Sequence, residues 1–117
     1  PLTVFGDGSQ KRTFTSVHDI IDALILVMIS KSNGEIYNVG NPTNLYTILE
    51  IAKRILHLTN SKSEIIFTDG KALYGNTYEE AWNKIPNIEK ISALGWKPQQ
   101  SLDDILLEVI DSYRYKK

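Results

Sequence analysis

Three features of this 117-residue sequence predict an α/β fold with about four helices and three or four short strands. Short apolar stretches rich in β-branched and aromatic residues alternate with longer stretches in which apolar residues recur at helical spacing. A hydroxyl or amide side chain stands before each helical stretch, where it can accept a hydrogen bond from a free backbone amide. The length fits one domain, residues 1–117, with a single core.

The first strand and its turn are predicted within residues 3–14, TVFGDGSQKRTF. Gly6 and Gly8 permit the positive φ angles that a tight turn requires. We therefore expect residues 4–5 to pair with residues 13–14 across this turn, as a hairpin.

Polar residues of the same turn are candidates for a phosphate site. Asp7 or Ser9 can hydrogen-bond back to the turn backbone. Gln10, Lys11 and Arg12 bring together an amide, an ammonium and a planar guanidinium, which suits a nucleotide that carries a diphosphate. An ordinary hairpin with solvated charges is the alternative that these residues alone leave open.

A helix is predicted from Ser16 to about Ser30, with apolar residues on nearly every side. We therefore expect neighbouring elements to enclose this helix almost completely. His18, in its first turn, is either a general base or a solvated histidine. After a helix end at residues 33–34, Asn-Gly, residues 35–39 alternate as a half-buried strand.

The second half of the chain continues the alternation of helix and strand. Residues 47–58 begin with the Thr-x-x-Glu signature of a capping box and continue with one apolar face, which predicts a helix. Residues 64–68 form a strand by their β-branched and aromatic content. Residues 87–94 predict a short helix, Ser101 caps the last helix, and Trp96 belongs to the core.

Residues 69–86 lose clean periodicity, although they contain two tyrosines, a tryptophan and two glutamates. A connection of this length inside a compact domain is usually functional or disordered. Because exposed aromatic side chains are unfavourable, we favour a ligand-facing loop over a disordered one.

Composition excludes several classes of function. The formal charge of −1, from 13 basic and 14 acidic side chains, provides no field that attracts nucleic acid or an anionic membrane. The chain has no cysteine and therefore no disulfide or thiolate metal site, and its longest apolar run is too short to span a bilayer. These features predict a cytoplasmic location without nucleic-acid, membrane or metal partners, and the start without methionine suggests part of a longer protein.

Three segments, PLTVFGDGSQKRTFTSVHDIIDAL, GEIYNVGNPTNLYTILEIAKRIL and LGWKPQQSLDDIL, resemble in this order the C-terminal part of extended short-chain dehydrogenases, the NAD-dependent epimerase/dehydratase family. The resemblance covers nearly all of the chain. It implies a small substrate-binding domain that works beside an NAD-binding Rossmann domain, which this chain lacks, and a parent protein that forms homo-oligomers. The parts QKR, GNPTN and YGNTYEEAWNKIPNI resemble the UDP-glucuronic acid oxidative decarboxylases of polymyxin resistance.

The resemblance also implies a reaction and a set of site residues. The parent would oxidise UDP-glucuronic acid at C4 with NAD and release carbon dioxide, giving a UDP-4-keto-pentose. Lys84 stands where the family has an arginine proposed to protonate the intermediate, so it is either a catalytic acid or a solvated loop charge. The residues implied in binding the UDP-sugar are Thr3, Val4, Phe5, Gly6, Asp7, Gly8, Ser9, Gln10, Lys11, Arg12 and Tyr78.

Alternatives within and outside this family stay open. A 4-epimerase or 4,6-dehydratase would use the same domain, and a non-catalytic binding module would need no reaction at all. The chain has no G-x-x-G-x-x-G segment, with which the family holds NAD. We therefore expect this chain to bind no cofactor and to be inactive alone.

Overall fold

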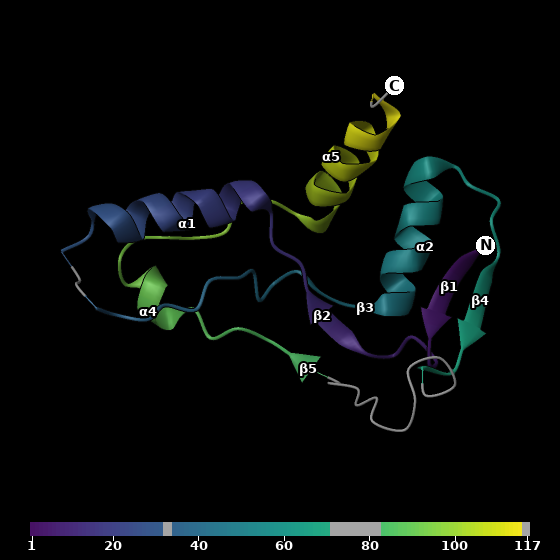
Figure 1. The fold of residues 1–117 in the computed structure, drawn as a ribbon, viewed down its shortest axis with the longest axis horizontal. Helices are drawn as coiled ribbons and strands as arrows, with labels where there is room; N and C mark the ends of the chain where they lie inside the picture. Colours follow the sequence, from purple (N-terminus) through teal and green to yellow (C-terminus); the bar gives the residue numbers. More distant parts are fainter. Residues whose placement is uncertain (32–33, 71–82, 116–117) are drawn as a thin grey trace. The chain divides into compact units, whose positions relative to one another are not determined.

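The computed structural model describes residues 1–31, 34–70 and 83–115 (Figure 1). The chain forms two compact units. The first unit contains Pro1–Arg12 and Tyr46–Lys84, and the second contains Thr13–Leu45 and Ile85–Lys117. Each unit has buried apolar residues, among them Val4 and Ile51 in the first and Ile91 and Trp96 in the second.

A parallel strand pair and one helix make up most of the first unit. Strand β1 (Leu2–Phe5) pairs in parallel with β4 (Ile65–Thr68), and Val4 lies opposite Phe67 in the register. Helix α2 (Ile48–Thr59) lies between these strands in the sequence and contacts β1. Parallel strands require such a crossover connection. The predicted strand at residues 64–68 and the predicted helix are confirmed.

The predicted hairpin is wrong, because β1 and the next strand belong to different sheets. Strand β2 (Lys11–Thr13) lies between β3 (Leu45–Thr47) and β5 (Asn83–Lys84), and it pairs with β5 in parallel. The intervening residues 6–10 bind to other parts of the first unit instead of closing a two-strand turn. The sequence therefore predicted the turn but not the strand that pairs with β1.

A serine caps the start of each of the other two long helices. Helix α1 (Val17–Ile29) begins after Ser16, whose hydroxyl accepts a hydrogen bond from the His18 amide. Helix α5 (Leu102–Arg114) begins after Ser101 with a complete capping box. Both helix starts are confirmed.

The predicted helix at residues 87–94 is shorter in the structure. Helix α4 (Glu89–Ser92) has no side-chain cap on Ile88, although the Asn87 side chain accepts a hydrogen bond from the Glu89 amide at 2.9 Å. Gly95, at φ 98°, follows the helix in a left-handed conformation that glycine adopts without strain.

The core of the second unit surrounds Trp96, as predicted. Trp96 is buried together with Ala23 and Ile91, and its indole Nε1 donates to the carbonyl of Asp19 at 2.9 Å. The partly buried side chains packed against this cluster are Leu26, Val27, Tyr37, Val39 and Ile88.

Asp19 is a buried polar residue that the sequence did not reveal. Its carboxylate accepts hydrogen bonds from the backbone amides of Gln99 at 3.0 Å and Gln100 at 3.2 Å. Asp19 therefore joins the first turn of α1 to the segment before α5, and it does not close a capping box with Ser16.

Two predictions for the second unit are wrong. Helix α1 is not enclosed, because six large apolar side chains along it are substantially exposed. Residues 35–39 form no strand, since no neighbouring strand pairs with them in the described ranges. A strand requires a partner for its backbone groups, and alternation in the sequence alone cannot supply one. Among the described residues, no helix is long and apolar enough to cross a membrane.

Candidate functional site

The turn at residues 6–10 is fixed at two points of the first unit. The Gly6 amide donates to the carbonyl of Thr68 at 2.9 Å, next to the β1–β4 pair. The Gly8 carbonyl accepts from the Leu49 amide at 3.0 Å, in the first turn of α2. The backbone of this turn is therefore preorganised by both the sheet and the helix.

Gly6 and Gly8 both adopt positive φ angles, 63° and 74°, as their position in the sequence predicted. Gly8 is buried, and a Cβ atom there would lie 2.9 Å from both Leu49 Cβ and Val4 Cγ1. Real Cβ atoms do not approach other atoms so closely. Gly8 is thus required both for its conformation and for the close approach of the turn to α2.

Asp7 has a structural role in the turn. Its Oδ1 accepts a hydrogen bond from the Ser9 amide at 2.8 Å, which confirms the predicted bond back to the turn backbone. Hydrogen bonds from the Ser9 side chain and backbone hold the pKa of the Asp7 carboxyl below its ordinary value. The ionised carboxylate is therefore directed at the turn itself.

Gln10 and Arg12 form a connected pair. The Gln10 side chain is buried, and its Oε1 accepts a hydrogen bond from Arg12 Nη2 at 3.0 Å. Arg12 Nη1 donates to the carbonyl of Lys11 at 2.8 Å. Two bonds therefore orient the half-buried guanidinium, and Gln10 supports Arg12 from the interior of the unit.

The β2–β5 pairing places Lys84 beside Arg12. Arg12 lies opposite Lys84 in the parallel register, and Lys11 lies opposite Asn83. Neighbouring residues of one strand point to opposite faces, so Lys11 projects away from the face that Arg12 and Lys84 share. The sequence placed Gln10, Lys11 and Arg12 side by side, whereas the structure separates Lys11 from the other two and adds Lys84.

Lys11 lies instead near the start of α2. Hydrogen bonds from the Thr47 backbone and side chain lower the pKa of the Glu50 carboxyl, and the charges of Lys11 and Lys53 lower it further. The Glu50 carboxylate accepts from the Thr47 amide at 2.7 Å, and Thr47 Oγ1 accepts from the Glu50 amide at 3.1 Å. This confirms the predicted capping box.

The starts of the long helices bear on cofactor binding. A dinucleotide usually places its pyrophosphate at an open helix N-terminus. The side chains of Thr47 and Glu50 close the start of α2, Ser101 and Asp104 close that of α5, and Ser16 caps α1. The described residues therefore offer a pyrophosphate no open start on these three helices, and the sequence has no G-x-x-G-x-x-G segment. Nor do they contain a group of three His, Cys, Asp or Glu side chains that could hold a metal ion.

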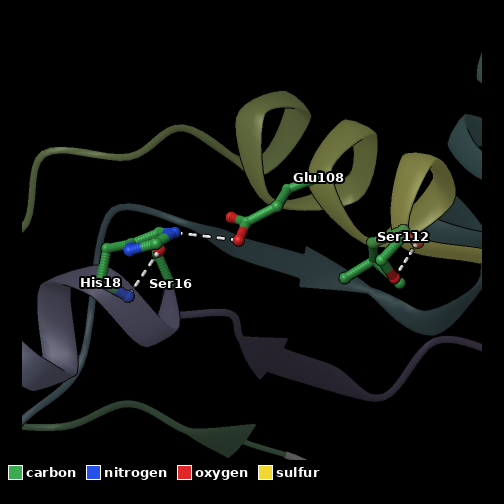
Figure 2. Close-up of polar contacts among 5 residues, drawn as sticks. Ser16, His18, Glu108 and Ser112 are labelled. Carbon is green, nitrogen blue, oxygen red and sulfur yellow. Dashed lines mark hydrogen bonds and ion pairs between the residues drawn. The ribbon is translucent and has the colours of Figure 1, made fainter. Parts of the chain in front are cut away.

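His18 has a partner that the sequence did not reveal. His18 Nε2 on α1 lies 2.9 Å from Glu108 Oε1 on α5, and a dashed line marks this contact in Figure 2. Both side chains are more than half exposed. The pair is a surface contact within the second unit, and a contribution of at most about 1 kcal/mol is typical of such pairs.

One further expectation depends on a residue outside the described ranges. Tyr78 lies there, so the structure does not test its predicted contact with a ligand.

Comparison with known proteins relates the chain to a family. Residues 1–40 match the model of the NAD dependent epimerase/dehydratase family. A UDP-N-acetyl-alpha-D-glucosaminuronate decarboxylase from Bacillus cytotoxicus is 37% identical over 97% of this chain and 35% of the relative. The chain is therefore similar to members of the NAD-dependent epimerase/dehydratase family. A bifunctional polymyxin resistance protein from Wigglesworthia glossinidia brevipalpis is 31% identical over 97% of this chain and 19% of the relative.

Solved structures of this family have the same fold. The UDP-glucuronic acid 4-epimerase of Bacillus cereus, in complex with UDP-glucuronic acid and NAD, matches 97% of this chain and 35% of its own, with a TM-score of 0.84 and 29% identity. The PbgP3 protein of Burkholderia pseudomallei matches 98% of this chain and 35% of its own, with a TM-score of 0.79 and 30% identity. The α/β fold class is therefore confirmed, and the chain spans about a third of the length of curated relatives that it matches.

Proposed function

We propose that the first compact unit binds the diphosphate of a UDP-sugar on the face of the β2–β5 pair that carries Arg12 and Lys84. In this proposal the chain is the substrate-binding part of an NAD-dependent UDP-glucuronic acid decarboxylase. The observation that carries the proposal is the register of Arg12 with Lys84, together with the fixed orientation of the guanidinium.

The register creates a cationic face. Neighbouring strands lie about 4.8 Å apart, so Arg12 and Lys84 place two cationic side chains on adjacent strands of one face. An anion bound on this face is attracted by both charges. A planar guanidinium held by Gln10 and the Lys11 carbonyl needs little reordering before it meets a phosphate.

Lys84 is proposed as the residue that returns a proton to the sugar. After carbon dioxide leaves, the carbon that carried the carboxylate holds an electron pair, and the Lys84 ammonium donates a proton to it. The exposed Lys84 side chain and its position beside Arg12 support this role, because a diphosphate bound at Arg12 brings the sugar to the same face. The remaining residues of the turn shape the backbone that the nucleotide approaches.

The names of the relatives support a sugar-nucleotide substrate. They include decarboxylases and UDP-apiose/UDP-xylose synthases, and a solved relative holds UDP-glucuronic acid. Because the sequence has no G-x-x-G-x-x-G segment, we assign oxidation of the sugar to a part of the polypeptide outside this chain, and we propose that the chain alone is inactive. The structural match to a UDP-glucuronic acid 4-epimerase favours 4-epimerisation as the second candidate. Only decarboxylation yields a pentose. NMR of the product formed by a polypeptide that contains this chain and is as long as its relatives therefore separates decarboxylation from 4-epimerisation.

Calorimetric titration of the chain with UDP tests the binding proposal. Arg12→Met should raise the Kd of UDP at least tenfold, since a hydrogen bond to a charged group contributes about 1.5–3 kcal/mol. Lys11→Met is the matched control, because Lys11 is the neighbouring cation on the opposite face, and it should change the Kd less than twofold. Equal effects of the two substitutions would contradict the assignment of the diphosphate to the Arg12 face, and a wild-type chain that does not bind UDP would contradict the proposal as a whole.

A further inference from the structure

The turn at residues 6–10 and the first turn of helix α2 are joined by backbone hydrogen bonds. The first amides of a helix have no partner inside the helix and need one outside it. The Ile48 amide donates to the Gln10 carbonyl at 3.0 Å. The Leu49 amide, next in the helix, donates to the Gly8 carbonyl at 3.0 Å. The turn therefore supplies acceptors that the start of α2 requires, and α2 in return fixes two carbonyls of the turn.

The capping box of α2 holds the backbone that presents these amides. Glu50 Oε2 accepts hydrogen bonds from the Thr47 amide at 2.7 Å and from Thr47 Oγ1 at 2.9 Å. Thr47 Oγ1 in turn accepts from the Glu50 amide at 3.1 Å. Ile48 and Leu49 lie between these two residues, so the box orients the amides that bind the turn. Glu50 itself is exposed, and this backbone connects it to the turn.

Gln10 connects the same backbone to Arg12. Its carbonyl accepts from the Ile48 amide, while its buried side chain accepts from Arg12 Nη2 at 3.0 Å. A looser start of α2 would release the Gln10 backbone and move the side-chain acceptor away from the guanidinium. Hydrogen bonds and backbone therefore form a continuous connection from Glu50 to Arg12, within the first unit.

Helix α5 provides a matched comparison. Its start is closed by a capping box of the same kind, in which Asp104 Oδ2 accepts from the Ser101 amide at 2.9 Å and Ser101 Oγ accepts from the Asp104 amide at 3.3 Å. This box belongs to the second unit, whereas the turn and Arg12 belong to the first. Removing it measures the loss of a capping box without the connection to Arg12.

We propose that Glu50 is a positioning residue, which acts through the start of α2 and through Gln10 on the orientation of Arg12. The effect is reciprocal, because a diphosphate that binds the oriented guanidinium must also stabilise the closed start of α2. The inference rests on the proposed function for the identity of the ligand. The connection from Glu50 to Arg12 is already present in the ligand-free chain.

Amide hydrogen exchange, measured by NMR on the wild-type chain, tests the reciprocal effect without any substitution. At saturating UDP, exchange through opening of the α2 start slows by the ratio of the UDP affinities of the closed and open forms. Loss of the Gln10 acceptor corresponds to a ratio of about five. We therefore expect the Ile48 and Leu49 amides to exchange about fivefold more slowly with UDP. The Asp104 amide at the start of α5 should change less than twofold.

Calorimetric titration of variants with UDP tests the forward effect. Glu50→Ala opens the start of α2 in part of the molecules, so the Kd of UDP should rise about threefold. Asp104→Ala should leave the Kd unchanged. Glu50→Gln should also leave it unchanged, because glutamine at this position still accepts from the Thr47 amide. In the Arg12→Met background, Glu50→Ala should cause no further loss, which a merely structural effect would not explain.

The results that overturn this inference differ from those that contradict the proposed function. If UDP binds, equal effects of Glu50→Ala and Asp104→Ala, or unchanged exchange at Ile48 and Leu49, would overturn the inference alone. If the wild-type chain does not bind UDP, the proposed function fails. NMR relaxation of the Arg12 Nε–H group in the ligand-free chain then decides the inference. Lower order in Glu50→Ala than in Asp104→Ala would support it, and equal order would overturn it.

Discussion

Replacing Gln10 with methionine should weaken UDP binding through Arg12. Methionine keeps a side chain of similar length and fits a buried position, but it removes the Oε1 acceptor that receives Arg12 Nη2 at 3.0 Å. The bond from Arg12 Nη1 to the Lys11 carbonyl remains. An arginine side chain has about 2 kcal/mol of rotamer entropy, and releasing its bond to Gln10 should restore part of it, ~1 kcal/mol. Since the ligand must then order the side chain again, the Kd of UDP should rise about fivefold.

A double-mutant cycle separates this effect from a general effect on the fold. UDP and uridine are titrated into wild type, Gln10→Met, Arg12→Met and the double variant. Gln10→Met should change the Kd of uridine, which has no phosphate, less than twofold. In the Arg12→Met background it should add no further loss of UDP affinity, which corresponds to a coupling energy of about 1 kcal/mol between Gln10 and Arg12.

The reasoning is refuted if Gln10→Met weakens UDP binding equally with and without Arg12. Such additivity would mean that Gln10 acts on the ligand directly or through the fold of the first unit. Thermal unfolding of each variant identifies the second cause, because a loss of the fold lowers the melting temperature and weakens uridine binding as well. A coupling confined to UDP can come only from support of the phosphate-binding guanidinium.

Three further substitutions test how the structure is held together. Gly8→Ala should destabilise the protein by about 2–4 kcal/mol in urea unfolding, because the new Cβ brings left-handed backbone strain and collides with α2. Gly34 has a similar φ of 73° but open space around it. Gly34→Ala should therefore show only the backbone strain, about 1–2 kcal/mol. Asp19→Ala should cost about 3 kcal/mol, because it leaves two buried backbone amides without an acceptor, and Asp22→Ala on the exposed side of α1 is its control. The pKa of Glu50 is lowered in the fold, so its stabilising contribution is present above its ordinary pKa of 4.5 and is lost as the pH falls through the folded value. Unfolding from pH 3 to 7 should therefore show a smaller loss of stability in acid for Glu50→Gln than for wild type, and parallel curves would contradict this role of the carboxylate.

Local signals in the sequence predicted local structure well. The hydroxyl caps at Ser16, Thr47 and Ser101 mark the starts of three helices because a cap involves only residues within one turn of each other. The positive φ angles of Gly6 and Gly8 follow from the absence of a side chain. Each of these features is decided within a few residues, and a single sequence contains the information.

Pairing between distant segments could not be predicted in the same way. The strand at β1 has its partner in β4, and the hairpin was expected only because residues 13–14 were the nearest apolar strand along the chain. Likewise, the alternation of residues 35–39 is typical of a strand, but the chain provides no neighbour for it among the described residues. The exposed side of α1 has the same explanation, since a pattern adapted to burial shows that a neighbour is needed and does not show where the neighbour lies.

The candidate site combines a segment that local signals predicted with a strand pairing that they could not predict. The polar run of Gln10, Lys11 and Arg12 was predicted as one group, but strand alternation turns its members to different faces, and the pairing with β5 brings Lys84 to the face of Arg12. A lysine that replaces the family's arginine is ambiguous in the sequence, because a solvated charge and an acid look alike there. The register places Lys84 beside Arg12 on the proposed binding face, and the role of Lys84 stays a prediction that the binding and product experiments decide.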